Sequence, residues 1–167
     1  MRYAAHSQYP QSQTKNMNTM STTDTSPMSV LERMFFAEMT YMKSGHKDIA
    51  ILATAFHPDV VVHEPSSLPY CGDWNGLHGV AALLRQMDRC FSNMRVQDLQ
   101  CTGTEAHLYV SCNLFLTARA TGITINQPFV EILSFANGLL VEGRPYYFDT
   151  TEIGRALGNE YSTTFNG

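Results

Sequence analysis

The chain has 167 residues, of which 44% are hydrophobic, and this is enough for one domain with a sizeable core. The net charge of −4 and the lack of any Lys/Arg cluster argue against a nucleic-acid-binding protein. No apolar run is long enough to span a membrane, and the four cysteines form no CxxC pair. We therefore expect reduced thiols rather than a zinc site or a disulfide framework.

The first 26 residues are rich in Ser, Thr, Gln and Asn and show no hydrophobic period, which is typical of a disordered tail. They also lack the continuous apolar core of a secretory signal, so we expect a cytoplasmic protein. The domain is predicted to span residues 27–158, and residues 159–167 are predicted to form a flexible C-terminal tail.

Helical patterns occupy the first part of this domain. Order should begin at Pro27, where Ser29 and Glu32 fit a capping box, and the first helix should end at Gly45. Its apolar stripe consists of Leu31, Met34, Phe35, Met39 and Met42. Glu38 lies beside this stripe. A second helix is predicted at about residues 47–56, with Ile49, Leu52, Ala53 and Phe56 facing inward. A third is predicted at about residues 77–91.

A Val-rich strand at residues 59–64 is predicted between the second and third helices, and it stops at His63-Glu64. A carboxylate at the end of a buried strand costs free energy unless it is paired, hydrogen-bonded or protonated. Glu64 is therefore a candidate site residue, although a glutamate at a strand end is more often solvated. His63 should face the opposite side. The loop aromatics Tyr70 and Trp74 could stack on a ligand or plug the core.

After Asn93 the hydrophobic pattern changes to a period of two, which predicts strands at residues 95–102, 106–118, 123–136 and 139–149. Asn137-Gly138 is a strong hairpin signal. Helices followed by such a meander indicate an α+β fold, in which a cone-shaped, curved mixed or antiparallel sheet wraps about three N-terminal helices. A cone of this kind leaves an internal pocket for one small ligand.

Three segments in this order resemble the nuclear transport factor 2-like superfamily, in its SnoaL-like polyketide cyclase and ketosteroid isomerase-like branch. They are PDVVVHEP with the later GLHGVAALL, then FVEILSFANGLLVEGR, and finally the YYFD ending. The resemblance covers nearly everything from Ser29 to Asp149 and implies the cone fold. It is weaker evidence for one reaction, because this fold hosts many unrelated functions.

The resemblance places Glu64 where ketosteroid isomerases have their proton-shuttling Asp, and Glu131 where they have a protonated Asp that binds the enolate oxygen. SnoaL-type cyclases use a general acid/base carboxylate at the position of Glu131. Glu38 stands where the isomerases have an oxyanion-binding Tyr, with Tyr41 three residues on, and this departure argues against true ketosteroid isomerisation. Acids that share one dry cavity push their pKa values apart, which provides one base and one acid.

These residues favour a cofactor-independent isomerase, cyclase or dehydratase that transfers a proton on a hydrophobic carbonyl or polyketide-like compound. Glu131 and Glu64 are the predicted catalytic residues. The predicted substrate-binding residues are Glu38, Tyr41, Tyr70, Trp74, Phe129, Arg144, Tyr146, Tyr147 and Asp149. No metal or cofactor is expected, because the histidines form no i, i+4 pair and no glycine loop of the phosphate-binding kind is present.

Several alternatives remain open. Glu131 could pair with Arg144 across the hairpin, and Asp149 could cap the segment that follows it. The domain could be a non-catalytic ligand-binding or dimerisation module, or an epoxide hydrolase-like enzyme for which Asn113, Arg144 and Tyr70 exist but no Asp-Arg-Asp group can be assembled. We also expect a homodimer through the sheet, because one helical layer cannot cover both of its faces.

Overall fold

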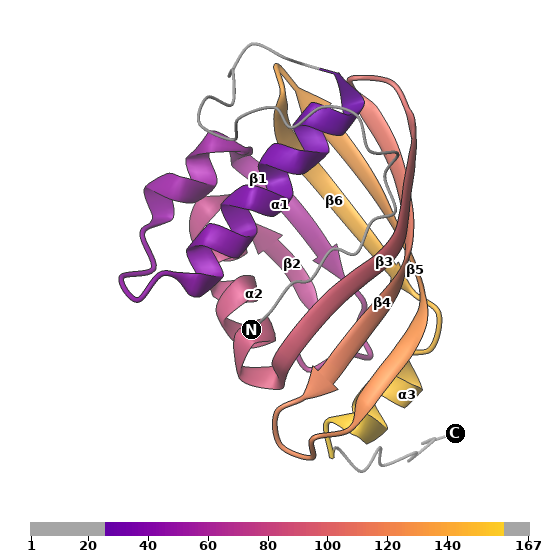
Figure 1. Ribbon diagram of the computed structural model, residues 1–167. Coiled ribbons are helices and arrows are strands. Elements are labelled where there is room, and N and C mark those ends of the chain that lie inside the picture. The colour runs from indigo at the N-terminus through magenta and orange to yellow at the C-terminus, as the bar shows by residue number, and fades with distance from the viewer. Residues whose placement is uncertain (1–25, 159–167) are drawn as a thin grey trace, which may run out of the picture.

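The computed structural model describes residues 26–158. The tail predicted at residues 1–26 lies outside the described residues except for Ser26, and the tail predicted at residues 159–167 lies wholly outside them. The elements follow one another as helices, then a strand, then a helix, then a long meander (Figure 1). They are α1 (Pro27–Lys43), the 3₁₀ helix η1 (Ile49–Thr54), β1 (Phe56–Glu64), β2 (Gly72–Asn75), α2 (Gly76–Cys90), β3 (Phe91–Gly103), β4 (His107–Ala118), β5 (Thr124–Ala136), β6 (Leu139–Tyr147) and α3 (Thr150–Ala156).

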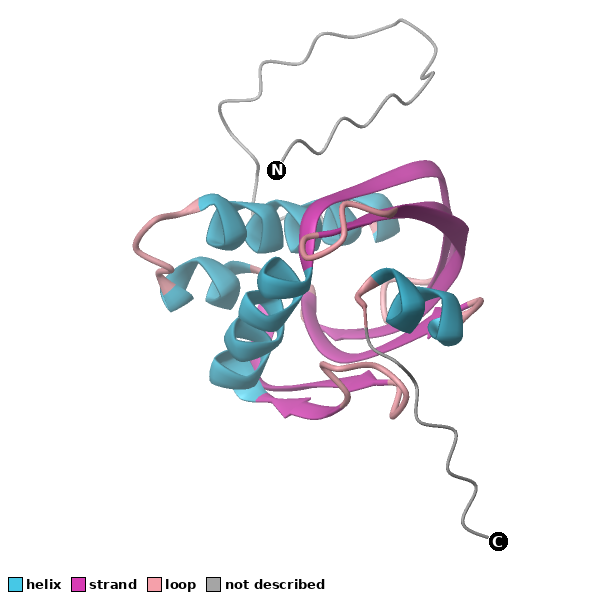
Figure 2. Cartoon of the chain, turned by 90° about the horizontal axis from the view of Figure 1, so that it is seen from below, coloured by secondary structure: helices cyan, strands magenta, loops and turns pink. Residues whose placement is uncertain are grey.

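The six strands form one mixed sheet in the order β2-β1-β6-β5-β4-β3. All neighbours are antiparallel except β1 and β6, which are parallel. The sheet curls strongly, with α1 and α2 on one side of it and α3 near one open end of the curl (Figure 2). The predicted α+β fold, with a curved sheet around N-terminal helices, is confirmed. No helix among the described residues is long and apolar enough to cross a membrane.

The strand β4 shows why this sheet has one buried face. Its burial alternates along the strand, so every second side chain is buried, as the predicted period of two requires. The buried set is Leu108, Val110, Cys112, Leu114 and Leu116. The turn between β5 and β6 is made by Asn137 and Gly138, both with positive φ (52° and 74°), as a two-residue hairpin turn requires. The predicted hairpin is therefore confirmed.

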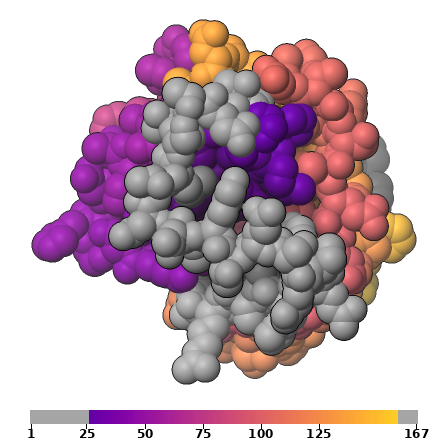
Figure 3. Space-filling view, turned by 45° about the horizontal axis from the view of Figure 1, so that its top comes forward, coloured from indigo at the N-terminus to yellow at the C-terminus, as the bar shows by residue number. Residues whose placement is uncertain are grey.

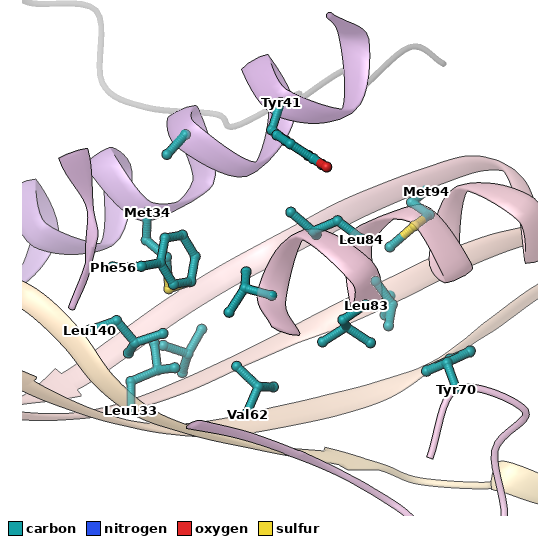
Figure 4. Packing of buried hydrophobic residues seen from close by; sticks show 14 of the residues in the cluster. Met34, Tyr41, Phe56, Val62, Tyr70, Leu83, Leu84, Met94, Leu133 and Leu140 are labelled. Atoms are coloured by element: carbon teal, nitrogen blue, oxygen red, sulfur yellow. The ribbon is translucent and has the colours of Figure 1, made fainter. Parts of the chain in front are cut away.

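The main core lies between α1, α2 and the concave face of the sheet. Figure 4 shows Met34 of α1, Leu84 of α2, and Val62 and Leu133 of the sheet pointing toward one another across this layer. Each fully buried side chain of this size contributes about 1.5–3 kcal/mol of transfer free energy. On the outside, α1 lies between the η1 region and the start of the meander (Figure 3).

Three local predictions were wrong. Helix α1 begins at Pro27 with Ser26 at the N-cap, so Ser29 is already helical and does not start a capping box. The second helix is a 3₁₀ helix, and its tighter turn of three residues leaves Ala53 exposed rather than inward. The short strand β2 was not predicted, because its four residues include an extended pair, Gly72-Asp73, that carries no apolar alternation.

Candidate functional site

Three glutamates from three separate elements converge on the interior. Glu64 ends β1 in the inward register of Val60 and Val62, and only 8% of it is exposed. Glu131 occupies the inward register of β5, two residues before the buried Leu133. Glu38 follows the buried Ala37 on α1. The structure therefore brings the predicted catalytic residues Glu64 and Glu131 together with Glu38, which was predicted to bind substrate. None of the three forms an ion pair within residues 26–158.

Burial dominates the electrostatics of these acids. Loss of hydration raises the pKa of Glu38 to about 8, and the charge of Glu131 adds to this shift. Burial likewise raises the pKa of Glu64 to about 8, with further contributions from Glu131 and Glu38. The pKa of Glu131 rises to about 7 through burial. Near neutral pH the group therefore holds both protonated and ionised carboxyls, and this is the condition for an acid and a base in one site.

Tyr147, the last residue of β6, is the polar partner of Glu64. Its hydroxyl donates a hydrogen bond to the Glu64 carboxylate, which opposes the rise in the pKa of that carboxyl. Burial raises the pKa of Tyr147 well above its ordinary value, and Tyr70 and Glu64 raise it further. Its ring packs edge-on against Phe129, with ring centroids 5.1 Å apart. Tyr147 is therefore a neutral donor held by Phe129 and by the buried Tyr70.

The immediate surroundings of the acids are poor in polar partners. Glu64 Oε2 is buried and has no hydrogen-bond partner among the described residues. The Cys112 thiol lies near Glu131, and burial together with the Glu131 charge raises the pKa of that thiol to about 12. On β6, Gly143 lies beside this acid, since a Cβ at the glycine would be in ordinary van der Waals contact with Glu131 Oε1, at 3.6 Å. The thiol stays neutral and does not neutralise the acids.

Three predicted site residues lie elsewhere. In the register between β5 and β6, Glu131 is opposite Pro145 and Arg144 is opposite Ile132. Arg144 therefore lies on the other face of the sheet from Glu131, and the alternative in which these two residues form an ion pair is wrong. Arg144 is exposed and donates to Glu142 at 2.7 Å. Tyr146 shares that outer face and is 52% exposed. Tyr41 is buried between α1 and α2, where Arg85 donates to its hydroxyl at 2.6 Å.

The remaining sequence-predicted residues have structural partners. Asp149 caps α3, since its Oδ1 accepts hydrogen bonds from the backbone N–H groups of Thr151 and Glu152 at 2.8 and 3.0 Å. The capping alternative for Asp149 is thus confirmed. The indole N–H of Trp74 donates to the Tyr70 carbonyl at 2.9 Å, and its ring packs on the core.

His63 faces outward, as predicted. One ring nitrogen lies 2.7 Å from Asp73 and the other lies 3.1 Å from Glu142. Within the described part of the chain no three His, Cys, Asp or Glu side chains are grouped so that they could hold a metal, and all four cysteines are free.

One buried polar residue was missed by the sequence interpretation. Gln127 is only 2% exposed and lies on the inward face of β5, four residues before Glu131. The signal was present in the alternation Ile125-Gln127-Phe129-Glu131, which places Gln127 at a core position. The flanking Asn126 and Pro128 weakened the strand pattern, because both are uncommon within strands.

Comparisons with known proteins agree with this architecture. An NTF2-like protein of unknown function from Burkholderia pseudomallei K96243 is 22% identical, with a TM-score of 0.62, and the match covers 77% of this chain and 96% of that one. A proposed SnoaL-like polyketide cyclase from Jannaschia sp. CCS1 is 14% identical, with a TM-score of 0.63 and coverage of 78% and 90%. TerC, co-crystallised with polyporic acid, is 17% identical, with a TM-score of 0.63 and coverage of 78% and 98%.

These structural matches show that the fold is NTF2-like. No curated protein matches the sequence of this chain. The family model of the SnoaL-like domain matches residues 34–143, a range that includes Glu38, Glu64 and Glu131. The chain therefore belongs to the SnoaL-like domain family.

Proposed function

We propose that this protein is a cofactor-independent enzyme of the isomerase, cyclase or dehydratase type, which transfers a proton on a hydrophobic carbonyl or polyketide-like compound. The observation that carries the proposal is the convergence of the buried Glu64 with the half-buried Glu38 and Glu131, with no cationic partner in the described chain. Three acids that lose hydration without an opposing charge destabilise a fold, so this grouping is better explained by chemistry than by stability.

In the proposed mechanism Glu131 is the base. It has the lowest pKa of the three, about 7, so it is the first to be ionised as the pH rises. Its carboxylate takes a proton from the carbon next to the substrate carbonyl. The electron pair of that C–H bond moves toward the carbonyl oxygen and forms an enolate. The protonated Glu131 then returns the proton. In an isomerisation the proton goes to another carbon of the conjugated enolate, and in a dehydration it goes to a hydroxyl that leaves as water while the enolate electrons re-form the carbonyl and a C=C bond. In a ring closure the enolate carbon forms a bond to the carbon of a second carbonyl, and the proton goes to the oxygen of that carbonyl.

Glu64 is the proposed acid in the same step. With a pKa of about 8 it stays largely protonated at neutral pH, and its carboxyl can donate a hydrogen bond to the developing enolate oxygen. Its unpartnered Oε2 provides a position for that contact, while the Tyr147 hydroxyl holds the other side of the carboxyl group. Glu38 adds a third acid whose protonation follows the charge of Glu131.

The family supports the choice of a small carbonyl compound, because one structural neighbour is a proposed SnoaL-like polyketide cyclase. That neighbour is 14% identical, so the likeness supports the fold and leaves the substrate to be found by experiment.

A direct test needs no knowledge of the natural substrate. The protein is incubated with 2-tetralone, a hydrophobic ketone with acidic C–H bonds, in D₂O near pD 7, and the exchange of its α-protons is followed by NMR. We expect the wild-type protein to accelerate exchange, and Glu131→Gln to slow it by about a hundredfold or more. Glu142→Gln is the matched control, because Glu142 is a half-buried glutamate on the outer face.

The outcome also separates two functions. Saturable binding of 2-tetralone and related hydrophobic ketones without any acceleration of exchange would contradict the enzyme and favour the alternative, a ligand-binding module of the same fold. Acceleration that Glu131→Gln leaves unchanged would remove Glu131 from the mechanism.

A further inference from the structure

The side chain of Gln127 has a buried amide whose hydrogen bonding indicates a role beyond that of the three glutamates. Gln127 Oε1 accepts a hydrogen bond from the backbone N–H of Asp149 at 2.7 Å. A backbone N–H can only donate, so the oxygen and not the nitrogen of the amide must face Asp149. This bond sets the orientation of the side chain. The amide nitrogen therefore faces away from the N-terminus of α3.

That nitrogen is left without an acceptor. Gln127 Nε2 is buried and has no hydrogen-bond partner within the described part of the chain. A buried donor that loses its water and gains no partner is costly, and most buried polar groups avoid this state. The bond to Asp149 uses only the oxygen of Gln127, so the structural role leaves the NH₂ group unexplained.

The position of Gln127 relates it to the acids. Gln127, Phe129 and Glu131 share the inward face of β5, because each is two residues from the next. At about 3.3 Å per residue, the backbones of Gln127 and Glu131 are about 13 Å apart. The Phe129 ring lies between them along the strand and packs on Tyr147. Gln127 thus lies at the α3 end of the strand face whose middle carries Glu131, the proposed base.

We propose that Gln127 is a specificity-determining binding residue, whose NH₂ group donates a hydrogen bond to an oxygen at the far end of the substrate. This inference rests on the proposed function, since it assumes that the ligand carbonyl sits at Glu131 and Glu64. It narrows the substrate class to flat, elongated, largely aromatic compounds that carry a second carbonyl or hydroxyl oxygen roughly 10 Å from the reacting one, somewhat less than the separation of about 13 Å between the two backbones. Phe129 and Tyr147 provide the edge-on aromatic wall against which such a compound would lie.

The test uses a matched pair of probes, 4-hydroxybiphenyl and 4,4′-dihydroxybiphenyl, which differ only in the distal oxygen. Affinities for the full-length protein are measured by calorimetry. We expect the wild type to prefer the dihydroxy probe by about threefold to tenfold, the contribution of one neutral hydrogen bond. Gln127→Met keeps the length of the side chain and removes its donor, so this variant should bind both probes equally. Gln100→Met makes the same change at an exposed position of β3 and should keep the preference.

A second measurement guards against misfolding of the Gln127→Met variant, which also loses the bond to Asp149. In the wild type, the side-chain amide protons of Gln127 should shift in the NMR spectrum on addition of 4,4′-dihydroxybiphenyl and much less with 4-hydroxybiphenyl. Equal affinity of the wild type for both probes, together with an unmoved Gln127 amide, would overturn the assignment of Gln127 and leave the proposed function standing. Failure of both probes to bind the wild type would contradict the ligand-holding interior, and both proposals with it.

Discussion

The charge of Glu131 on β5 raises the pKa of Glu38 on α1, although the two residues are far apart in the sequence. Helix α1 and the middle of the sheet therefore each contribute a carboxyl group to one electrostatically coupled cluster. Among residues 26–158 neither carboxyl has a cation to offset this interaction, so the protonation of one depends on the charge of the other.

Removal of the Glu131 charge should leave stability unchanged or raise it. Glu131→Gln keeps the shape of the side chain but abolishes a buried ionisable group, and it also lowers the pKa of Glu38 by removing the repulsion. At pH 8 we expect an equal or higher melting temperature than for the wild type. Differential scanning calorimetry measures this, with Glu105→Gln, at an exposed position, as the surface control. A clear loss of stability for Glu131→Gln alone would indicate a structural partner for Glu131.

Stability should fall as the pH rises from about 5 to 9. The folded-state pKa values of Glu38, Glu64 and Glu131 lie above their ordinary value of 4.5, so the folded protein binds more protons than the unfolded chain in this range. The stability contributed by these acids is present below pH 4.5 and is lost as the pH passes through about 7 to 8. Urea denaturation across this range should show the decline, and it should be shallower in the double variant Glu38→Gln/Glu131→Gln. A rise in stability over the same range would contradict the raised pKa values.

Tyr147→Phe should raise the pKa of Glu64. The hydrogen bond from the Tyr147 hydroxyl lowers the pKa of this carboxyl, and a phenyl ring cannot donate such a bond. Titration of the ¹³C-labelled Glu64 carboxyl by NMR measures the shift. Tyr146→Phe is the matched control, because Tyr146 is the neighbouring tyrosine on the outer face. An unchanged titration in Tyr147→Phe would mean that the hydroxyl does not bind Glu64.

Asp149→Ala should lower the free energy of unfolding by about 1 kcal/mol, the usual contribution of an N-cap. The variant loses the acceptor for two backbone N–H groups at the start of α3. Asp149→Asn retains an acceptor oxygen and should restore most of the loss in chemical denaturation. If both variants are equally destabilised, the charge of Asp149 and not its capping geometry is responsible.

We propose that the protein forms a homodimer through the convex face of its sheet. The concave set of β4 is buried, whereas the opposite face exposes Tyr109, Val130 and Tyr146 by 41–52%. Val130 pairs in register with Tyr146, so these side chains are neighbours on an apolar surface. Light scattering at micromolar concentration should give twice the monomer mass, and Val130→Glu should give the monomer. Phe36→Glu, at an exposed position of α1, should leave the dimer intact.

Most of the fold could be predicted from the sequence because its signals are local. The alternation along β4 and the Asn137-Gly138 turn are set by neighbouring residues, and both predictions hold. The inward direction of Glu64 also followed from the Val-rich strand. By contrast, the pairing of Arg144 with Glu142 instead of Glu131 depends on the register between β5 and β6, since a shift of one residue changes the face.

The partners of the site residues could not be predicted for a related reason. Tyr147 and Glu64 meet only because β1 lies beside β6, a pairing between distant segments that no local pattern specifies. Tyr41 has a helical spacing that suits the site, but its hydroxyl accepts a hydrogen bond from Arg85 of α2. The hydrophobic periodicity of each helix does not predict where two helices cross, so this contact could not be predicted.

The parallel pairing of β1 with β6 has a consequence for how the protein folds during its synthesis on the ribosome. The first strand to be synthesised can complete its ladder only after the last strand has emerged, so the middle of the sheet must wait for nearly the whole domain. Contacts of such long sequence separation close slowly, because loop-closure entropy must be overcome before they form. Until then the edge of β1 that pairs with β6 stays uncovered, and so do the apolar side chains of β1. Nascent chains of this domain should therefore depend on chaperones more than a domain built only from hairpins between neighbouring strands.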